Sequence, residues 1–163
     1  MLLVVLSGNE EAALRLGAAL ILGGVFGLNR ELHGKPAGLR THALVSLGAA
    51  VATIIVLRSP SGLLVADQNA VGRVVQGILT GVGFLGAGVI LRDPVGHVTG
   101  LTTAATIWIC ATLGIVCGLG YWVILGIAVG LTAFALLLGR PLERLAERLF
   151  KRHGSSEPPD HSV

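Results

Sequence analysis

The sequence is short of charge and of aromatic side chains. Only 13% of its 163 residues are Asp, Glu, Lys or Arg, and 4% are aromatic, whereas a soluble domain carries about 25% charged residues. So few charges cannot cover a water-facing surface, and the mean hydropathy is +0.80. The composition therefore excludes an ordinary soluble domain and predicts an integral membrane protein with one bundle of helices.

Cysteine is scarce as well. Cys110 and Cys117 are the only two, and both lie in one apolar run. On a helix they are roughly 10 Å apart along the axis, which is too far for a disulfide, and they do not have the spacing of a zinc site. The net charge of +3 comes without interleaved aromatic residues, so we expect no nucleic-acid binding. We also expect no metal and no cofactor.

Long apolar runs are what the chain has in abundance. A helix that spans a bilayer needs about 20 largely apolar residues, and five runs qualify. They cover residues 12–28, 39–57, 74–91, 101–119 and 121–138. The fold class predicted is thus all-α, a polytopic membrane bundle of about five transmembrane helices. The N-terminus has too short an apolar run, and no basic residues before it, for a signal peptide.

The distribution of basic residues predicts the orientation. Cytoplasmic loops carry an excess of Lys and Arg, and nine basic residues would share one side of the membrane. They are Arg30, Lys35, Arg40, Arg92, Arg140, Arg144, Arg148, Lys151 and Arg152. The other side would hold Arg15, Arg58 and Arg73, with Arg15 reaching to the interface as long side chains do. We therefore expect an N-terminus outside and a C-terminus in the cytoplasm.

The C-terminal part divides the chain further. Residues 1–139 form the predicted transmembrane domain. The segment "RPLERLAERLFKRHG" has leucines at helical spacing among charges, which predicts an amphipathic helix over 140–153 on the inner leaflet. The alternative is a helix that simply continues out of the fifth span. Residues 154–163 are polar and contain proline, and we expect them to be disordered.

An internal repeat appears when the chain is shifted by 62 residues. Arg30 then aligns with Arg92, Glu31 with Asp93, and "GLRTHA" with "GLTTAA", without a gap. Both units begin outside, turn in the cytoplasm and return, so the repeat is parallel, with its axis along the membrane normal. Spans 1–2 and 3–4 are expected to form two similar hairpins.

The segment "GVGFLGAG", residues 81–88, contains a G-x-G-x-x-G pattern. A dinucleotide site would need a preceding strand and an acidic residue about 20 positions later, and neither is present. We instead expect close helix packing at the glycines. The positions concerned are Gly81, Gly83, Gly86, Gly88 and Gly100. Several GxxxG pairs permit a homodimer, although packing within the chain is the simpler interpretation.

The predicted spans contain few side chains that could bind an ion or catalyse a reaction. No charged residue lies near the centre of any predicted span, whereas a magnesium path is expected to use carboxylate oxygens. This counts against a carboxylate-lined channel but leaves a carbonyl-lined one open. No Ser or Cys lies in a recognisable nucleophile setting, so we expect no enzyme.

The two cytoplasmic turns between spans, which we call elbows, gather most of the polar side chains. Spans 2 and 4 begin there, and helix N-termini present free N–H groups and partial positive charge. Together with nearby side chains these could bind an anion or an acidic partner. The candidates are Arg30, Glu31, Arg40, Thr41, Arg92, Asp93, Thr102 and Thr103. The alternative is that Arg30–Glu31 and Arg92–Asp93 merely tie the elbows through ion pairs and capping.

Three blocks in this order resemble the MgtC/SapB family of bacterial inner-membrane proteins. They are "GLNRELHGKPAGLRTHALVSLGAA", "GILTGVGFLGAGVILRD" and "VTGLTTAATIWICATLG". The resemblance covers residues 14–138 and implies a small multi-span domain associated with adaptation to low magnesium. It also implies that some members regulate other membrane machines such as ATP synthase.

The family pattern transfers onto particular positions. The motif matches are Arg30, Glu31, Gly38, Arg40 and Thr41; Gly81, Gly83, Phe84, Gly86, Ala87 and Gly88; and Gly100, Leu101, Thr102, Thr103, Ala104 and Trp108. Asn29 stands where the family often has an acid, and we expect the C-terminal regulatory domain of some members to be absent.

The leading interpretation is a non-enzymatic regulator of magnesium homeostasis. It would bind an anionic ligand or another membrane protein complex at its elbows, within the lipid bilayer. The alternatives are a magnesium transporter or channel component and a lipid-binding scaffold.

Overall fold

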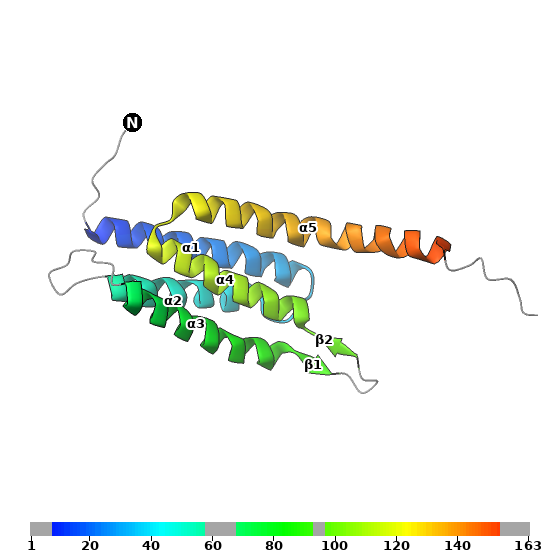
Figure 1. Ribbon diagram of the computed structural model, residues 1–163, viewed down its shortest axis with the longest axis horizontal. Helices are drawn as coiled ribbons and strands as arrows, with labels where there is room; N and C mark the ends of the chain where they lie inside the picture. The colour runs from blue at the N-terminus through cyan, green and yellow to red at the C-terminus, as the bar shows by residue number, and fades with distance from the viewer. Residues whose placement is uncertain (1–7, 58–67, 93–96, 154–163) are drawn as a thin grey trace, which may run out of the picture. The chain divides into compact units, whose positions relative to one another are not determined.

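Five helices make up most of the structure. The computed structural model describes residues 8–57, 68–92 and 97–153. The helices are α1 (Gly8–Leu32), α2 (Leu39–Leu57), α3 (Gln68–Val89), α4 (Leu101–Leu119) and α5 (Trp122–His153) (Figure 1). Each contains a stretch long and apolar enough to cross a membrane. The predicted fold class, a multi-pass helical membrane bundle, is therefore confirmed.

The helix ends show where hydropathy is and is not informative. The bounds of α2 and α4 coincide with the prediction, and they are related by the same 62-residue shift as the repeat. In contrast, α1 begins at Gly8 and α3 at Gln68, before the apolar runs that the prediction used. In α1 the added turn carries Glu10 and Glu11, which favour a helix N-terminus because of its partial positive charge.

The residues up to Leu125 form one compact unit, with α2 and α4 at its centre. These two helices run in the same direction, since His42 contacts Thr106 and Gly118 approaches Thr53. Helix α1 packs against both, and α3 packs against α4 and, less extensively, against α2. Equivalent helices of the repeat thus occupy equivalent places, as expected for two parallel hairpins.

Glycines let the central helices touch backbone to backbone. A Cβ on Gly114 of α4 would lie 2.1 Å from the carbonyl oxygen of Ser46, and one on Gly23 of α1 would lie 2.5 Å from that of His42. Gly27 and Gly118 are similarly close to their neighbours. Small residues of this kind are what allows helices to approach closely in lipid.

The glycines that the sequence analysis selected have different surroundings from those of the central helices. Gly81, Gly83 and Gly88 of α3 have no heavy atom within 4 Å of a Cβ position, and Gly86 would make only an ordinary contact, 3.5 Å from Ala104. No described residue packs closely against the first three, so a role for them in helix packing stays a prediction. Gly100 is required for a different reason, because its φ of 89° is left-handed and a Cβ would meet Val89 O at 2.0 Å.

The second elbow contains a feature that the all-α prediction did not include. Strand β1 (Leu91–Arg92) pairs antiparallel with β2 (Val98–Thr99), with Leu91 opposite Thr99. The first elbow has no such pair; there α1 continues to Leu32, and Gly34 turns the chain with a φ of 61°. The two hairpins therefore share their helices but not their turns.

Helix α5 continues without interruption from Trp122 to His153 and contains Pro141. The helix thus runs past residue 139, as in the alternative of a helix that continues out of the fifth span, and the division of the chain at 139 and 153 stays a prediction. From Gly126 onward the chain forms a second unit. The predicted disordered tail, 154–163, lies outside the described residues.

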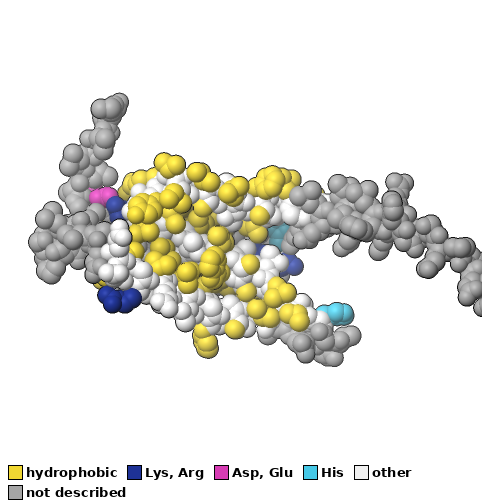
Figure 2. All heavy atoms as spheres, in the orientation of Figure 1, with side chains coloured by type: hydrophobic (Ala, Val, Ile, Leu, Met, Phe, Trp, Pro, Cys, Tyr) yellow, Lys and Arg dark blue, Asp and Glu magenta, His cyan; other side chains and the backbone are white. Residues whose placement is uncertain are grey.

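The distribution of apolar and charged side chains over the surface agrees with a membrane-spanning bundle. Hydrophobic side chains cover the flanks of the helices in Figure 2, and the Lys, Arg, Asp and Glu side chains visible there lie toward the helix ends. Exposed large apolar residues such as Ile21, Ile55 and Phe84 are expected for surfaces that face lipid.

Candidate functional site

Both elbows lie at one end of the α1–α4 unit, which we call the elbow end (Figure 1). Helix α1 runs antiparallel to α2 and α4, because Gly27 meets Leu39 and Arg30 meets Thr103. Helices α2 and α4 both start at this end. The structure thus gathers the predicted site residues that it describes at one end of the unit, although not into one cluster.

Arg30 points into the bundle. It lies in the last turn of α1, its exposed fraction is 5%, and its Nη2 donates a hydrogen bond of 2.5 Å to Thr103 Oγ1 in the first turn of α4. Thr103 is itself buried. Arg30 therefore links the two hairpins and does not expose its guanidinium at the surface of the elbow end.

Glu31 has a different partner. Its Oε2 accepts a hydrogen bond of 3.0 Å from the backbone N–H of Leu39, the first residue of α2. Gly38 makes room for this contact, since a Cβ there would lie 2.5 Å from the same oxygen. The N-terminus of α2, which the sequence suggested as an anion site, is thus already capped by a carboxylate of the chain.

The remaining described candidates are exposed. Arg40, Thr41 and Thr102 all lie on the surface of the elbow end, and Lys35 in the first elbow is exposed as well. Neither Arg40 nor Lys35 forms an ion pair with any residue that the structure describes. The side chain of Arg92 and the whole of Asp93 lie outside the described part of the chain.

A buried polar group lies directly beneath the elbows, and the sequence analysis did not single it out. His42, fully buried on α2, contacts the Gly38 carbonyl oxygen through Nδ1 at 2.9 Å and Thr106 Oγ1 of α4 through Nε2 at 3.2 Å. Thr106 Oγ1 also lies 2.9 Å from Thr103 O. Arg30, Thr103, Thr106 and His42 therefore form one chain of contacts across α1, α4 and α2, which we call the buried relay.

A signal for this group was present in the sequence. His42, Ser46 and Thr53 are spaced by four and seven residues, which places them on one face of a helix. Polar side chains inside a spanning helix usually face the bundle interior, and all three are fully buried. The identity of their partner on α4 could not be derived from this spacing.

Arg15 provides the matching contact at the opposite end. Its exposed fraction is 8%, its Nη1 donates a hydrogen bond of 2.6 Å to Gly118 O, and its Nη2 pairs with Glu11. The side chain is thus enclosed by the bundle, and its reach to the membrane interface stays a prediction. The carbonyls in the last turn of a helix carry partial negative charge, and this end of α4 holds the guanidinium inside the bundle.

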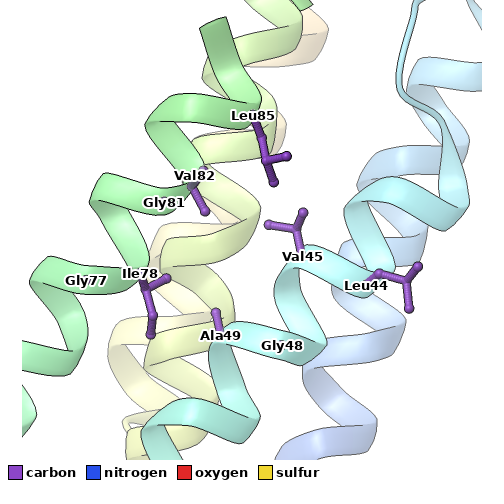
Figure 3. Close-up of a pocket in the computed structure, with 9 residues that line it drawn as sticks. All are labelled: Leu44, Val45, Gly48, Ala49, Gly77, Ile78, Gly81, Val82 and Leu85. Carbon is purple, nitrogen blue, oxygen red and sulfur yellow. The ribbon is translucent and has the colours of Figure 1, made fainter. Parts of the chain in front are cut away.

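An apolar groove of about 380 Å³ runs between α2 and α3 (Figure 3). Gly48, Gly77 and Gly81 lie along the groove and add no side chains to its walls. Val45 and Val82 are among the side chains that line it. At the repeat-equivalent interface Arg15 takes the place of Gly77, since 62 residues separate them. The groove contains no polar side chain and offers no chemistry of its own.

Metal ligands do not gather in the described part of the chain. No group of three or more His, Cys, Asp or Glu side chains lies close enough there to hold an ion. The side chains that the elbow end exposes include two basic ones, Arg40 and Lys35.

Comparison with known proteins places the chain in a family. The sequence matches the MgtC family over residues 16–145. It is 42% identical to Protein SrpB of Synechococcus elongatus, across 90% of this chain and 87% of SrpB. It is also 38% identical to Protein MgtC of Brucella abortus, across 88% of this chain and 57% of that protein.

A third relative, Protein MgtC of Salmonella typhimurium, is 46% identical across 66% of this chain. The alignment covers 43% of that protein, so the chain spans about half the length of the two MgtC relatives. No solved structure matches the sequence.

Proposed function

Because the chain belongs to the MgtC family, we propose that it is a non-enzymatic regulator of magnesium homeostasis in a bacterial inner membrane. It acts by presenting a basic surface at the elbow end to an acidic segment of another membrane protein complex, of which ATP synthase is one candidate. The N-terminus lies outside, and the elbows and C-terminus lie in the cytoplasm, as the distribution of Lys and Arg favours.

One observation carries this proposal. The elbow end separates its charges into two sets, because Arg30 is buried and Glu31 caps α2, while Arg40 and Lys35 are exposed without ion pairs in the described residues. The inward set stabilises the turn, and the outward set is available to a partner. Exposed basic groups attract acidic surfaces and raise association rates.

Charge reversal tests this proposal in the cell. Arg40→Glu and Lys35→Glu would be introduced together and compared with wild type in low-magnesium growth of a strain that lacks its own copy. Arg73→Glu is the matched control, because Arg73 is also exposed but lies near the start of α3, at the opposite end. We expect the double variant to lose the growth advantage and the control to keep it.

Two results would contradict the proposal. If the double variant supports growth as wild type does, at equal membrane abundance, the elbow surface is not the working surface. If purified wild-type protein in liposomes transports magnesium, measured with an internal indicator, the alternative of a transporter replaces the regulator.

A further inference from the structure

We propose that the groove between α2 and α3 holds one acyl chain of an anionic phospholipid, whose phosphate is bound by Arg40 at the elbow end. The proposal goes beyond the proposed function and does not rest on it, although both use Arg40. The groove lies wholly within the unit that ends at Leu125, and the side chains along it point toward one another from α2 and α3 (Figure 3).

The groove exists because the two halves of the repeat close to different degrees. Helix α3 is the repeat equivalent of α1, yet it packs less extensively against α2 than α1 packs against α4. A Cβ on Gly23 or Gly27 of α1 would lie under 3 Å from backbone atoms, whereas one on Gly77 or Gly81 of α3 would meet no heavy atom within 4 Å. A space of about 380 Å³ therefore stays open beside α3.

A space of this kind does not stay empty in a bilayer. No polar side chain lines it, so it offers little to bind water, and apolar spaces stay dry. If it were empty, the atoms along it would lose their dispersion contacts on one side. The solvent around a spanning helix is lipid hydrocarbon, so an acyl chain is the material available to fill the groove.

The dimensions fit an acyl chain better than a helix. Along α3 the groove runs from Gly77 to Leu85, about 12 Å, which is close to the depth of one leaflet of a hydrocarbon core about 30 Å thick. A helix about 10 Å wide would occupy roughly 900 Å³ over this length, whereas the groove offers about 380 Å³. A helix of a second copy could therefore insert only its side chains.

Two polar side chains lie where the headgroup of such a lipid would be. Arg40 comes one helical turn before Leu44, a residue of the groove, and so shares a face of α2 with it. Thr41 stands in the same relation to Val45. Both polar residues are exposed. A guanidinium binds phosphate through paired, charge-assisted hydrogen bonds, and a hydroxyl adds a further donor.

The charges near Arg40 favour a headgroup with a net negative charge. Lys35 in the first elbow is exposed as well, and neither residue forms an ion pair within the described chain. The acid closest in sequence, Glu31, is engaged with the backbone N–H of Leu39. Each basic side chain near a membrane surface raises the affinity for anionic lipid by about fivefold. An acidic partner at the elbow end would have to displace this headgroup from Arg40.

Arg73 allows a rival arrangement, because it is exposed and lies one turn before Gly77, at the other mouth of the groove. A lipid of the opposite leaflet would use it. We assign the phosphate to Arg40 because the groove is closer to the elbow end along α2. It begins at Leu44, about 8 Å from the start of that helix, and ends at Ala49, about 12 Å before its last residue.

Photochemical labelling of the full chain in nanodiscs tests the site. The bilayer would be phosphatidylcholine with a small proportion of phosphatidylglycerol that carries a diazirine on one acyl chain. After illumination, the labelled residues would be identified by mass spectrometry. We expect labels on Val45, Ala49 and Val82, which line the groove but are buried or half-buried, so that lipid outside the groove reaches them poorly.

A pair of glycine substitutions tests the groove itself. Gly81→Leu adds a side chain at a residue of the groove, where nothing lies within 4 Å of the new Cβ. Gly83→Leu is the matched control, since Gly83 is equally open and exposed on α3 but does not line the groove. We expect Gly81→Leu to abolish labelling of Val45 and Ala49, and Gly83→Leu to leave it unchanged.

A pair of arginine substitutions tests the headgroup. Arg40→Gln removes the charge, and the concentration of labelled phosphatidylglycerol that gives half-maximal labelling of Val45 should rise by about fivefold. Arg73→Gln should leave this concentration unchanged. The arginine pair does not alter the groove, so it tests the proposal even if Gly81→Leu fails to fold.

Several results would overturn the site. Absence of groove labels in the wild-type chain excludes a bound acyl chain, and if that chain is also a dimer, the groove belongs to a second copy. Equal labelling of Gly81→Leu and wild type means that the label does not come from the groove. Loss of labelling in Arg73→Gln rather than Arg40→Gln assigns the lipid to the opposite leaflet. None of these measurements involves growth or a partner, so failure of the lipid site and failure of the proposed function can be told apart.

Discussion

Replacing Gly114 by alanine is expected to destabilise the bundle by about 2 kcal/mol. The added Cβ would lie 2.1 Å from Ser46 O and 2.9 Å from Ser46 C, both of them backbone atoms of α2, whereas ordinary contacts begin at 3.4 Å. A flexible side chain could move aside, but here the two central helices would have to separate by roughly 1 Å, which disturbs the packing along their whole contact.

The magnitude follows from two opposing effects. Overpacking of a close-packed site costs about 1–3 kcal/mol, and contact with backbone favours the upper end of this range. Alanine also forms a helix more readily than glycine, by about 1 kcal/mol, which offsets part of the cost. The net loss is therefore about 2 kcal/mol, and Gly114→Ala also weakens the nearby contacts of His42 and Thr106.

The matched control is Gly81→Ala on α3, where nothing lies within 4 Å of the new Cβ. It should leave stability unchanged or raise it by up to about 1 kcal/mol, because only the helix propensity changes. The free energy of unfolding would be measured by reversible titration with SDS in mixed micelles. Equal stability of the two variants would refute the close approach of α2 and α4.

Three further predictions concern the polar contacts. Arg15→Met should cost about 2 kcal/mol in the same unfolding assay, because it removes the charged bond to Gly118 O, and Arg73→Met, an exposed control, should cost under about 0.5 kcal/mol. Glu31→Ala should lower stability by about 1 kcal/mol, since Leu39 N loses its cap; no loss would mean that water caps α2 equally well. Thr103→Val removes the acceptor of Arg30 and should cost about 1–3 kcal/mol, whereas Thr102→Val, at the neighbouring exposed position, should not.

Hydropathy and the repeat were sufficient to place the central helices. The apolar runs of α2 and α4 each begin directly after a glycine, Gly38 and Gly100, and the bounds of both helices were predicted correctly. The first turns of α1 and α3 were missed because a helix can begin several residues before its apolar run begins. The pair β1–β2 was missed because two residues per strand leave no periodic pattern.

The site was predictable in part, since the sequence identified the elbows but not the direction of each side chain. Arg30 and Arg40 look alike in sequence, yet one is buried against Thr103 and the other is exposed. Their difference depends on α4, which is more than 60 residues further along the chain. Glycines raise the same difficulty, because composition cannot show that Gly114 meets a backbone while Gly81 faces open space.

The two arginines of α1 also affect how the protein must be made. Arg15 finds its acceptor at Gly118, 103 residues later, and Arg30 finds Thr103 73 residues later. At about 5–20 residues per second, the ribosome needs roughly 5–20 s to supply the acceptor of Arg15. During that interval an arginine within a membrane segment costs up to about 3 kcal/mol.

Helix α1 therefore lacks these two acceptors until α4 has been synthesised. Both arginines reach their buried positions only once the second hairpin packs against the first.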